Sequence, residues 1–177
     1  YARKHPHRMG KWDAASKSHV AHMEDGDFYD SEQSYTMVNP GHLRIEFTSA
    51  TGSSFPLRGP VAVQAGEVID AAVMSASALA AFIDAQIEDA RARGVLFSLH
   101  LKATMMKVSD PIMFGIAVSR FYAPVLEKHP RTLAEIGFDP NNGIGDLYAR
   151  LGGLKEAERA GIEADIASLY ARRPALA

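Results

Sequence analysis

The sequence predicts a mixed α/β fold, on the borderline of α+β, with a layered sheet of a few strands in the first half packed by helices and a mostly helical second half. Apolar and polar residues alternate over residues 43–48, which is the period of a half-buried strand. From residue 79 onward the apolar residues recur instead at helical spacing. Strand-like runs followed by helical runs are typical of a layered domain. A chain of 177 residues has the length of about one domain and can bury a core. We therefore expect a single domain or subdomain. Because the sequence begins with Tyr1 rather than Met and ends without a polar tail, we expect it to be cut from a longer chain.

The first 40 residues are expected to form a largely irregular arm, and residues 41–177 the α/β body. The arm is basic over residues 1–20 and acidic between Glu24 and Glu32. Neither block shows apolar alternation, so we predict a single short helix there, around residues 18–23.

Three strands are expected in the first half of the body. The first covers residues 43–47, and a turn over residues 51–54 leads to a return strand over residues 55–58. Pro56 makes that return strand an edge strand, because proline has no amide hydrogen to donate. A third strand is predicted over residues 67–74.

A helix should follow, since one face collects Leu79, Phe82, Ile83, Ile87 and Ala90. Gly94 is expected to end this helix. The short apolar run over residues 95–101 then predicts a buried strand.

The second half is predicted to be helical. Asp110 is expected to cap a helix with Pro111 at its first position, and this helix should kink at Pro124 and stop before His129. Further helices are expected through Tyr148 and over residues 154–171.

Composition excludes several classes of function. The chain has no cysteine, which excludes disulfides, thiolate nucleophiles and cysteine-based zinc sites and fits a reducing compartment such as the cytoplasm. No apolar run approaches the length of a membrane-spanning helix. A net charge of −2 argues against a dedicated nucleic-acid binder. The glycines form no dinucleotide or phosphate-binding motif.

Residues 100–111 are the segment most suited to chemistry. They follow a predicted buried strand and precede a capped helix, a junction at which α/β proteins often place ligand-binding groups. Lys102 and Lys107 flank a hydroxyl, Thr104, and two methionines. A lysine desolvated there would exchange protons near neutral pH, whereas a lysine facing water would have no such role. Position alone leaves both readings open.

Four blocks of the sequence resemble one enzyme family. They lie at residues 1–10, at 18–23 with 26–29, at 99–114, and at 137–139 with 141–148. The third block contains the run Leu-Lys-Ala-Thr-Met-Met-Lys from Leu101 to Lys107. On these blocks the chain resembles the monomeric-type NADP-dependent isocitrate dehydrogenases over its whole length. The likeness is to the opening part of that family's second domain.

The resemblance implies an oxidoreductase that oxidises isocitrate with NADP and a Mg or Mn ion and then decarboxylates the product to 2-oxoglutarate. It implies that Lys102 is the catalytic lysine, which transfers a proton at the C2 oxygen of the substrate. Thr104 is expected to orient this lysine or to touch a substrate carboxylate, and Lys107 to be a solvated or phosphate-side charge. Ile116 departs from the family pattern, in which a polar residue stands at this position.

The same resemblance places the other working parts of the site outside residues 1–177. These parts are the clamp for the substrate carboxylates, the metal-binding aspartates, the catalytic tyrosine and the groups that bind NADP. We therefore assign no cofactor-binding or metal-binding residue here, and we expect this section alone to be inactive. Its expected partners are isocitrate or 2-oxoglutarate and the remainder of the parent chain, with no nucleic acid and no membrane.

A function of another class stays open. The chain could be a stand-alone, non-catalytic binding or interaction domain derived from the same fold, with its basic arm docked on an acidic partner.

Overall fold

The computed structural model describes residues 3–6, 10–100 and 109–177, and it confirms a mixed α/β composition. Contacts divide the chain into two compact units. One unit combines Tyr1–His22 with Leu79–Ala177 and contains the longer helices, whereas Met23–Ala78 form the other and contain the strands.

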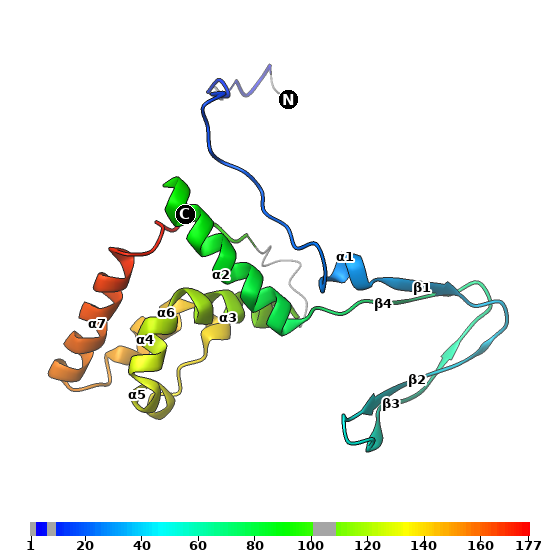
Figure 1. Cartoon of the computed structure of the whole chain (residues 1–177). Coiled ribbons are helices and arrows are strands. Elements are labelled where there is room, and N and C mark those ends of the chain that lie inside the picture. The colour runs from blue at the N-terminus through cyan, green and yellow to red at the C-terminus, as the bar shows by residue number, and fades with distance from the viewer. Residues whose placement is uncertain (1–2, 7–9, 101–108) are drawn as a thin grey trace. The chain divides into compact units, whose positions relative to one another are not determined.

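The strand unit consists of two antiparallel pairs, one nested inside the other in sequence (Figure 1). A short helix, α1 (Phe28–Ser31), leads into β1 (Gln33–Thr36), which pairs with β4 (Val68–Ala71). Between them lie β2 (Gly41–Thr48) and β3 (Ser54–Val63), which pair with each other. The three strands expected in this half are confirmed, and β1 is an additional one.

The strands do not join into one layered sheet, which corrects that part of the prediction. The pair β2–β3 is closed locally by its turn, where the Ser49 amide donates to the Ser53 carbonyl at 2.8 Å and Gly52 has a φ of +84°. Among the strand residues, only Val63 is buried. Alternation within residues 43–48 therefore identifies a strand correctly but says nothing about what covers it.

The helix predicted around residues 18–23 is wrong, because these residues form neither a helix nor a strand. A helix forms slightly later, at α1, where the Asp27 carboxylate accepts a hydrogen bond from the Asp30 amide at 2.8 Å. An aspartate in this capping position stabilises a helix start that the apolar pattern does not reveal.

The predicted amphipathic helix is confirmed as α2 (Ala76–Arg93). Its buried residues are Leu79, Ile83, Ile87 and Ala90, spaced as one helical face. Gly94, with a φ of +67°, ends it in a conformation that favours glycine.

The helix expected after Asp110 forms two helices rather than one with a kink. These are α3 (Ser109–Phe121) and α4 (Ala123–Lys128). Pro124 lies in the first turn of α4, where its missing amide hydrogen is not needed. Asp110 lies within the first turn of α3, so the prediction that it caps this helix is wrong.

The remaining helices complete the core of this unit. They are α5 (Pro130–Glu135), the 3₁₀ turn η2 (Pro140–Asn142), α6 (Ile144–Leu151) and α7 (Glu156–Tyr170). In this unit α3 packs on η2, and α4 packs on both α5 and α7 (Figure 1). The most deeply buried side chains are Ile87, Val125, Leu147, Leu151, Ile162, Ile166 and Leu169. Within the described part of the chain, no helix has the length and apolar character needed to cross a membrane.

The buried strand predicted over residues 95–101 is wrong for the residues that the structure describes. Residues 95–100 form a single bridge, in which Phe97 lies parallel to Leu176. Leu96 and Leu99 are 60% and 39% exposed. Leu101, the last residue of the predicted strand, lies outside the described residues.

Candidate functional site

The residues to which the sequence assigns chemistry, Lys102 and Thr104, lie outside the described residues, as does Lys107. The structure does describe what stands on either side of this segment. On one side is the run from α2 to His100, and on the other is α3, which begins at Ser109.

The first flank is tied to the end of the chain. The Val95 amide donates to the Ala90 carbonyl at 3.0 Å, which turns the backbone out of α2. The Phe97 amide then donates to the Ala175 carbonyl at 2.8 Å, and the Ala177 amide donates to the Phe97 carbonyl at 3.3 Å. Residues about 80 positions apart in sequence thus form a short parallel β-bridge.

The second flank, α3, is joined to the first through an aromatic cluster. The rings of Phe97 and Phe121 stack with centroids 6.3 Å apart and planes 19° apart. Phe121 also meets the ring of Tyr122 edge-on, with centroids 5.0 Å apart. Aromatic contacts of this kind stabilise packing by about 0.5–1.5 kcal/mol beyond their buried area.

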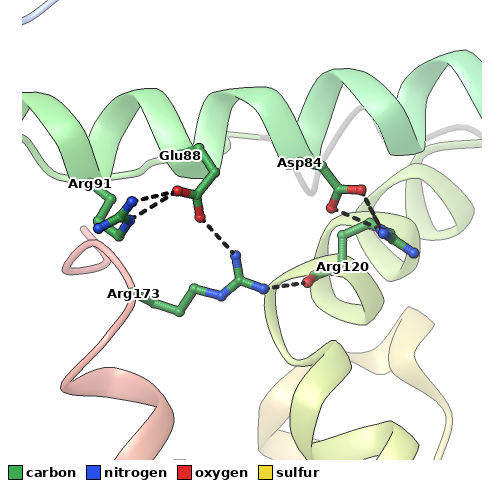
Figure 2. A network of polar contacts seen from close by, with 5 residues as sticks. All are labelled: Asp84, Glu88, Arg91, Arg120 and Arg173. Atoms are coloured by element: carbon green, nitrogen blue, oxygen red, sulfur yellow. Dashed lines mark hydrogen bonds and ion pairs between the residues drawn. The ribbon is translucent and has the colours of Figure 1, made fainter.

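A network of charged side chains also connects the two flanks (Figure 2). Asp84 of α2 accepts hydrogen bonds from Nε and Nη2 of Arg120, near the end of α3, with N···O distances between 2.5 and 3.1 Å. This is the paired geometry in which an arginine binds a carboxylate most strongly. The bond to Asp84 raises the pKa of Arg120 above its usual value.

Arg173 extends the network from the chain's end. One of its terminal nitrogens lies 3.7 Å from Oε1 of Glu88, on α2, and the other donates to the carbonyl of Arg120 at 3.5 Å (Figure 2). Its guanidinium carbon stands 5.9 Å from the centre of the Phe121 ring. Glu88 also forms an ion pair with Arg91, in which Nη2 of Arg91 lies 2.8 Å from Oε2 of Glu88.

A cavity of about 820 Å³ opens beside the first flank. Its walls are residues 18–21, the face of α2 from Phe82 to Ala90, residues 94–100 and Ala177. Most of this lining is apolar, and its titratable side chains are those of His19, Asp89 and His100.

His19 fastens one wall of the cavity to α2. Its Nε2 lies 2.9 Å from Oδ2 of Asp89, and its Nδ1 lies 2.9 Å from the carbonyl oxygen of Lys17. Each ring nitrogen therefore faces an oxygen atom, one of a carboxylate and one of a backbone carbonyl. A hydrogen bond from Arg93 is the main cause that lowers the pKa of Asp89, and the His19 charge contributes as well.

Comparison with known proteins decides the family. The model of the family described as monomeric isocitrate dehydrogenase matches residues 1–177. The chain belongs to the monomeric isocitrate dehydrogenase family. This confirms the resemblance seen in the sequence alone.

Relatives in this family are named isocitrate dehydrogenase [NADP]. The chain is 61% identical to the protein of that name from Azotobacter vinelandii. It is 50% identical to isocitrate dehydrogenase [NADP] 2 of Colwellia maris and 45% identical to isocitrate dehydrogenase [NADP] 2 of Mycobacterium tuberculosis. Each comparison covers 100% of this chain but 24% of the relative, so the chain spans about a quarter of their length.

Among the described residues there is no cluster of ligands for a metal ion, and the large cavity presents no described cation to a phosphate. Over residues 3–6, 10–100 and 109–177, no three His, Asp or Glu side chains gather in a way that could hold a metal. Proteins hold the phosphates of NADP with arginine, lysine or the start of a helix. The described lining of the large cavity contains neither arginine nor lysine. We therefore derive no step through either group from these residues.

Sequence reasoning missed the residues that join the two flanks. Asp84, Arg120 and Arg173 lie far apart in the chain, and charged residues on exposed helix faces are common. Arg120 lies in the last turn of α3, and nothing in the neighbouring sequence identifies its partner.

Proposed function

We propose that this chain is a section of an NADP-dependent isocitrate dehydrogenase and that it supplies Lys102 to a catalytic site completed by the rest of the full-length protein. One observation carries the proposal. The family model matches every residue of the chain, and the segment Lys102 to Lys107 lies within that match. The reaction would oxidise isocitrate with NADP and release carbon dioxide and 2-oxoglutarate, in the presence of Mg or Mn.

Lys102 would act at the C2 hydroxyl of isocitrate. Oxidation of an alcohol removes a hydride from carbon and a proton from oxygen. The lysine amine would exchange that proton, and in its ammonium form it would stabilise the negative charge that develops on the oxygen. When the product then loses carbon dioxide, charge develops on the same oxygen, so one group would serve both steps. Thr104 would orient the lysine or bind a substrate carboxylate.

Replacement of Lys102 in the full-length dehydrogenase tests the proposal. We expect Lys102→Met to lower kcat by about two to four orders of magnitude, which is the usual contribution of general acid–base catalysis. The KM for isocitrate should change much less. Lys155→Met, at an exposed lysine directly before α7, is the control and should keep its activity. A Lys102→Met enzyme that turns over at a near-normal rate would remove this lysine from the mechanism.

A second measurement concerns the section by itself. We expect residues 1–177 alone to produce no NADPH from isocitrate and NADP, because the other groups of the site belong to the rest of the protein. Steady production of NADPH by the purified section would contradict this. A cytoplasmic location belongs to the same proposal and is supported by the absence of cysteine from the sequence.

A further inference from the structure

We propose that one face of the β2–β3 ribbon is a docking surface for the part of the full-length polypeptide that lies outside residues 1–177. The ribbon consists of Gly41–Thr48 and Ser54–Val63 with the turn between them (Figure 1). The inference rests on the chain being a section of a longer dehydrogenase, as proposed above, and not on the role of Lys102. Every residue that carries it is described and belongs to the strand unit.

One face of the ribbon is apolar. Alternate residues of a strand point to the same side of a sheet, and residues directly opposite on the paired strand share that side. On β2 the alternating apolar residues are Leu43, Ile45 and Phe47. On β3 their face is continued by Val61, opposite Leu43, and by Phe55, opposite Phe47. The ring centroids of Phe47 and Phe55 are 5.2 Å apart, as expected for side chains on one side of the ribbon.

The opposite face of the ribbon is polar, and its side chains pair with one another. Nε of Arg44 lies 3.1 Å from Oε1 of Glu46. The hydroxyl oxygens of Thr48 and Ser54 lie 3.2 Å apart across the two strands. The ribbon therefore separates apolar from polar side chains, as antiparallel sheets do when one face packs on other protein and the other meets water.

The apolar face is exposed in the structure. Ile45 is 53% exposed, Phe47 45% and Phe55 52%. An exposed group of large apolar side chains beside polar ones marks an interaction surface. Within the described strands, β2 and β3 pair only with each other. A two-stranded ribbon is marginally stable by itself and becomes stable when a third strand or a packed face is added.

The length of the full protein indicates what covers this face. The chain spans 24% of its relative from Azotobacter vinelandii, so about three quarters of such a protein lies outside it. The family is described as monomeric, which argues against a second copy as the cover. A surface on the same polypeptide can reach an effective concentration of roughly millimolar, which favours it over a separate molecule. The occupant is therefore an apolar surface contributed by residues of the same polypeptide outside this section.

Thiol labelling of the folded full-length dehydrogenase tests the docking surface. Ile45→Cys places a thiol on the apolar face, and Arg44→Cys, the matched control, places one on the polar face of the same strand. The side chain of Arg44 is 63% exposed, so an uncovered ribbon would label at similar rates in both variants. We expect Ile45→Cys to label about 100-fold more slowly, because a thiol under a docked surface reacts only when that surface opens. Peptide mass spectrometry separates these thiols from any native ones.

The dependence of labelling on protein concentration tests the choice of occupant. Cover by the same polypeptide predicts that the protection of Ile45→Cys does not change on dilution. Protection that disappears on dilution would show that a second copy covers the face, and would overturn the proposal. Equal labelling rates in Ile45→Cys and Arg44→Cys would also overturn it, since the face would then be open. If Ile45→Cys does not fold, Val61→Cys replaces it on the same face.

A photoreactive group at position 55 locates the covering residues. p-Benzoylphenylalanine in place of Phe55 keeps an aromatic ring on the apolar face and cross-links to whatever lies against it. We expect cross-links within one polypeptide to residues outside the 177-residue section. Cross-links to residues 79–177 alone would show that the helical unit covers the face, and would overturn the proposal, as would the absence of any cross-link.

These measurements are independent of the catalytic assignment. If Lys102→Met keeps its rate, the catalytic role of Lys102 fails whatever the labelling shows. If Lys102→Met is inactive and Ile45→Cys labels as fast as Arg44→Cys, the docking surface fails and the proposed function stands.

Discussion

The hydroxyl oxygens of Tyr122 and Tyr170 lie 2.6 Å apart, in a hydrogen bond that joins the end of α7 to the junction between α3 and α4. Tyr122 is 3% exposed, and its ring also meets the Tyr170 ring edge-on with centroids 6.0 Å apart. The hydroxyl of Tyr122 has lost most of its access to water, so Tyr170 is an important partner for it.

Loss of this partner should destabilise the fold. We expect Tyr170→Phe to lower the free energy of unfolding by about 1–3 kcal/mol, because it leaves a buried hydroxyl without its bond. Urea unfolding of the chain measures this. The double variant Tyr122→Phe/Tyr170→Phe should cost less than the sum of the two single changes. Additive effects would show that the two hydroxyls do not interact.

Alkaline pH should weaken the same region. Burial is the main cause that raises the pKa of Tyr122 above the ordinary value of 10.0, and the bond to Tyr170 adds to it. In the unfolded chain this tyrosine therefore loses its proton at lower pH than in the folded chain. The contribution of Tyr122 to the free energy of unfolding should therefore be fully present below pH 10. Above pH 10 it should fall by at most about 1.4 kcal/mol per pH unit. Tyr122→Phe should reduce the slope of unfolding free energy against pH, and an unchanged slope would contradict the assignment.

Gly115 should not tolerate alanine, although it lies in the middle of α3. A Cβ there would stand 3.0 Å from the Cα of Asn141 and in collision with the side-chain oxygen of the same residue. We expect Gly115→Ala to destabilise by about 1–3 kcal/mol, the usual cost of overpacking.

Gly161, in α7, provides the control for Gly115. No atom lies within 4 Å of its Cβ position, so Gly161→Ala should stabilise the helix by up to about 1 kcal/mol. Opposite signs in urea unfolding confirm the close approach of α3 to η2. A stabilising Gly115→Ala would rule it out.

Acid should release a contact between α4, the start of α5 and α7. Asp165 accepts from Nζ of Lys128 at 2.7 Å and bonds Nε2 of His129 at 2.6 Å. The hydrogen bond from Lys128 is the main cause that lowers the pKa of the Asp165 carboxyl below 3.8, and the bond with His129 adds to it. Its contribution is thus present above pH 3.8 and is lost as pH falls further. Asp165→Asn should flatten the fall in unfolding free energy below about pH 4, whereas the exposed Asp25→Asn should not.

His19 should control how firmly residues 18–21 stay bound to α2. Lys17 is held there too, since its Nζ donates to the Arg93 carbonyl at 3.3 Å. We expect His19→Phe to increase the rate of tryptic cleavage after Lys17 several-fold, as the ion pair to Asp89 is lost. His42→Phe, an exposed change on β2, is the control. Equal rates for both variants would show that His19 does not fasten the segment.

Sequence periodicity correctly predicted the helices and strands whose apolar pattern lies within their own residues. The apolar spacing in α2 names its buried face correctly, and alternation from Leu43 to Phe47 finds β2. The same reasoning fails at residues 95–100, because a short apolar run does not reveal its partner. Phe97 is held by Leu176 and Phe121, and neither contact leaves a trace in the neighbouring sequence.

Only part of the candidate site could be predicted, because local sequence patterns do not reveal contacts between distant residues. Family resemblance, rather than periodicity, singled out Lys102 and Thr104, and both assignments remain predictions. The pairing of Asp84 with Arg120 could not be predicted, because 36 residues separate the two and neither helix carries a spacing signal for the other. Side-chain contacts between residues far apart in sequence depend on the tertiary structure, which local patterns do not determine.

The β2–β3 ribbon has a consequence for self-association. It is a two-stranded sheet, so each strand has one side without a β partner within the ribbon, and its exposed apolar residues include the paired rings of Phe47 and Phe55. Exposed strand edges recruit further strands from other molecules. Pro56 and Pro60 interrupt the row of amide donors on β3, whereas β2 contains no proline. Aggregation of the separately expressed section should therefore begin on β2, and a lysine placed there is the substitution that would suppress it.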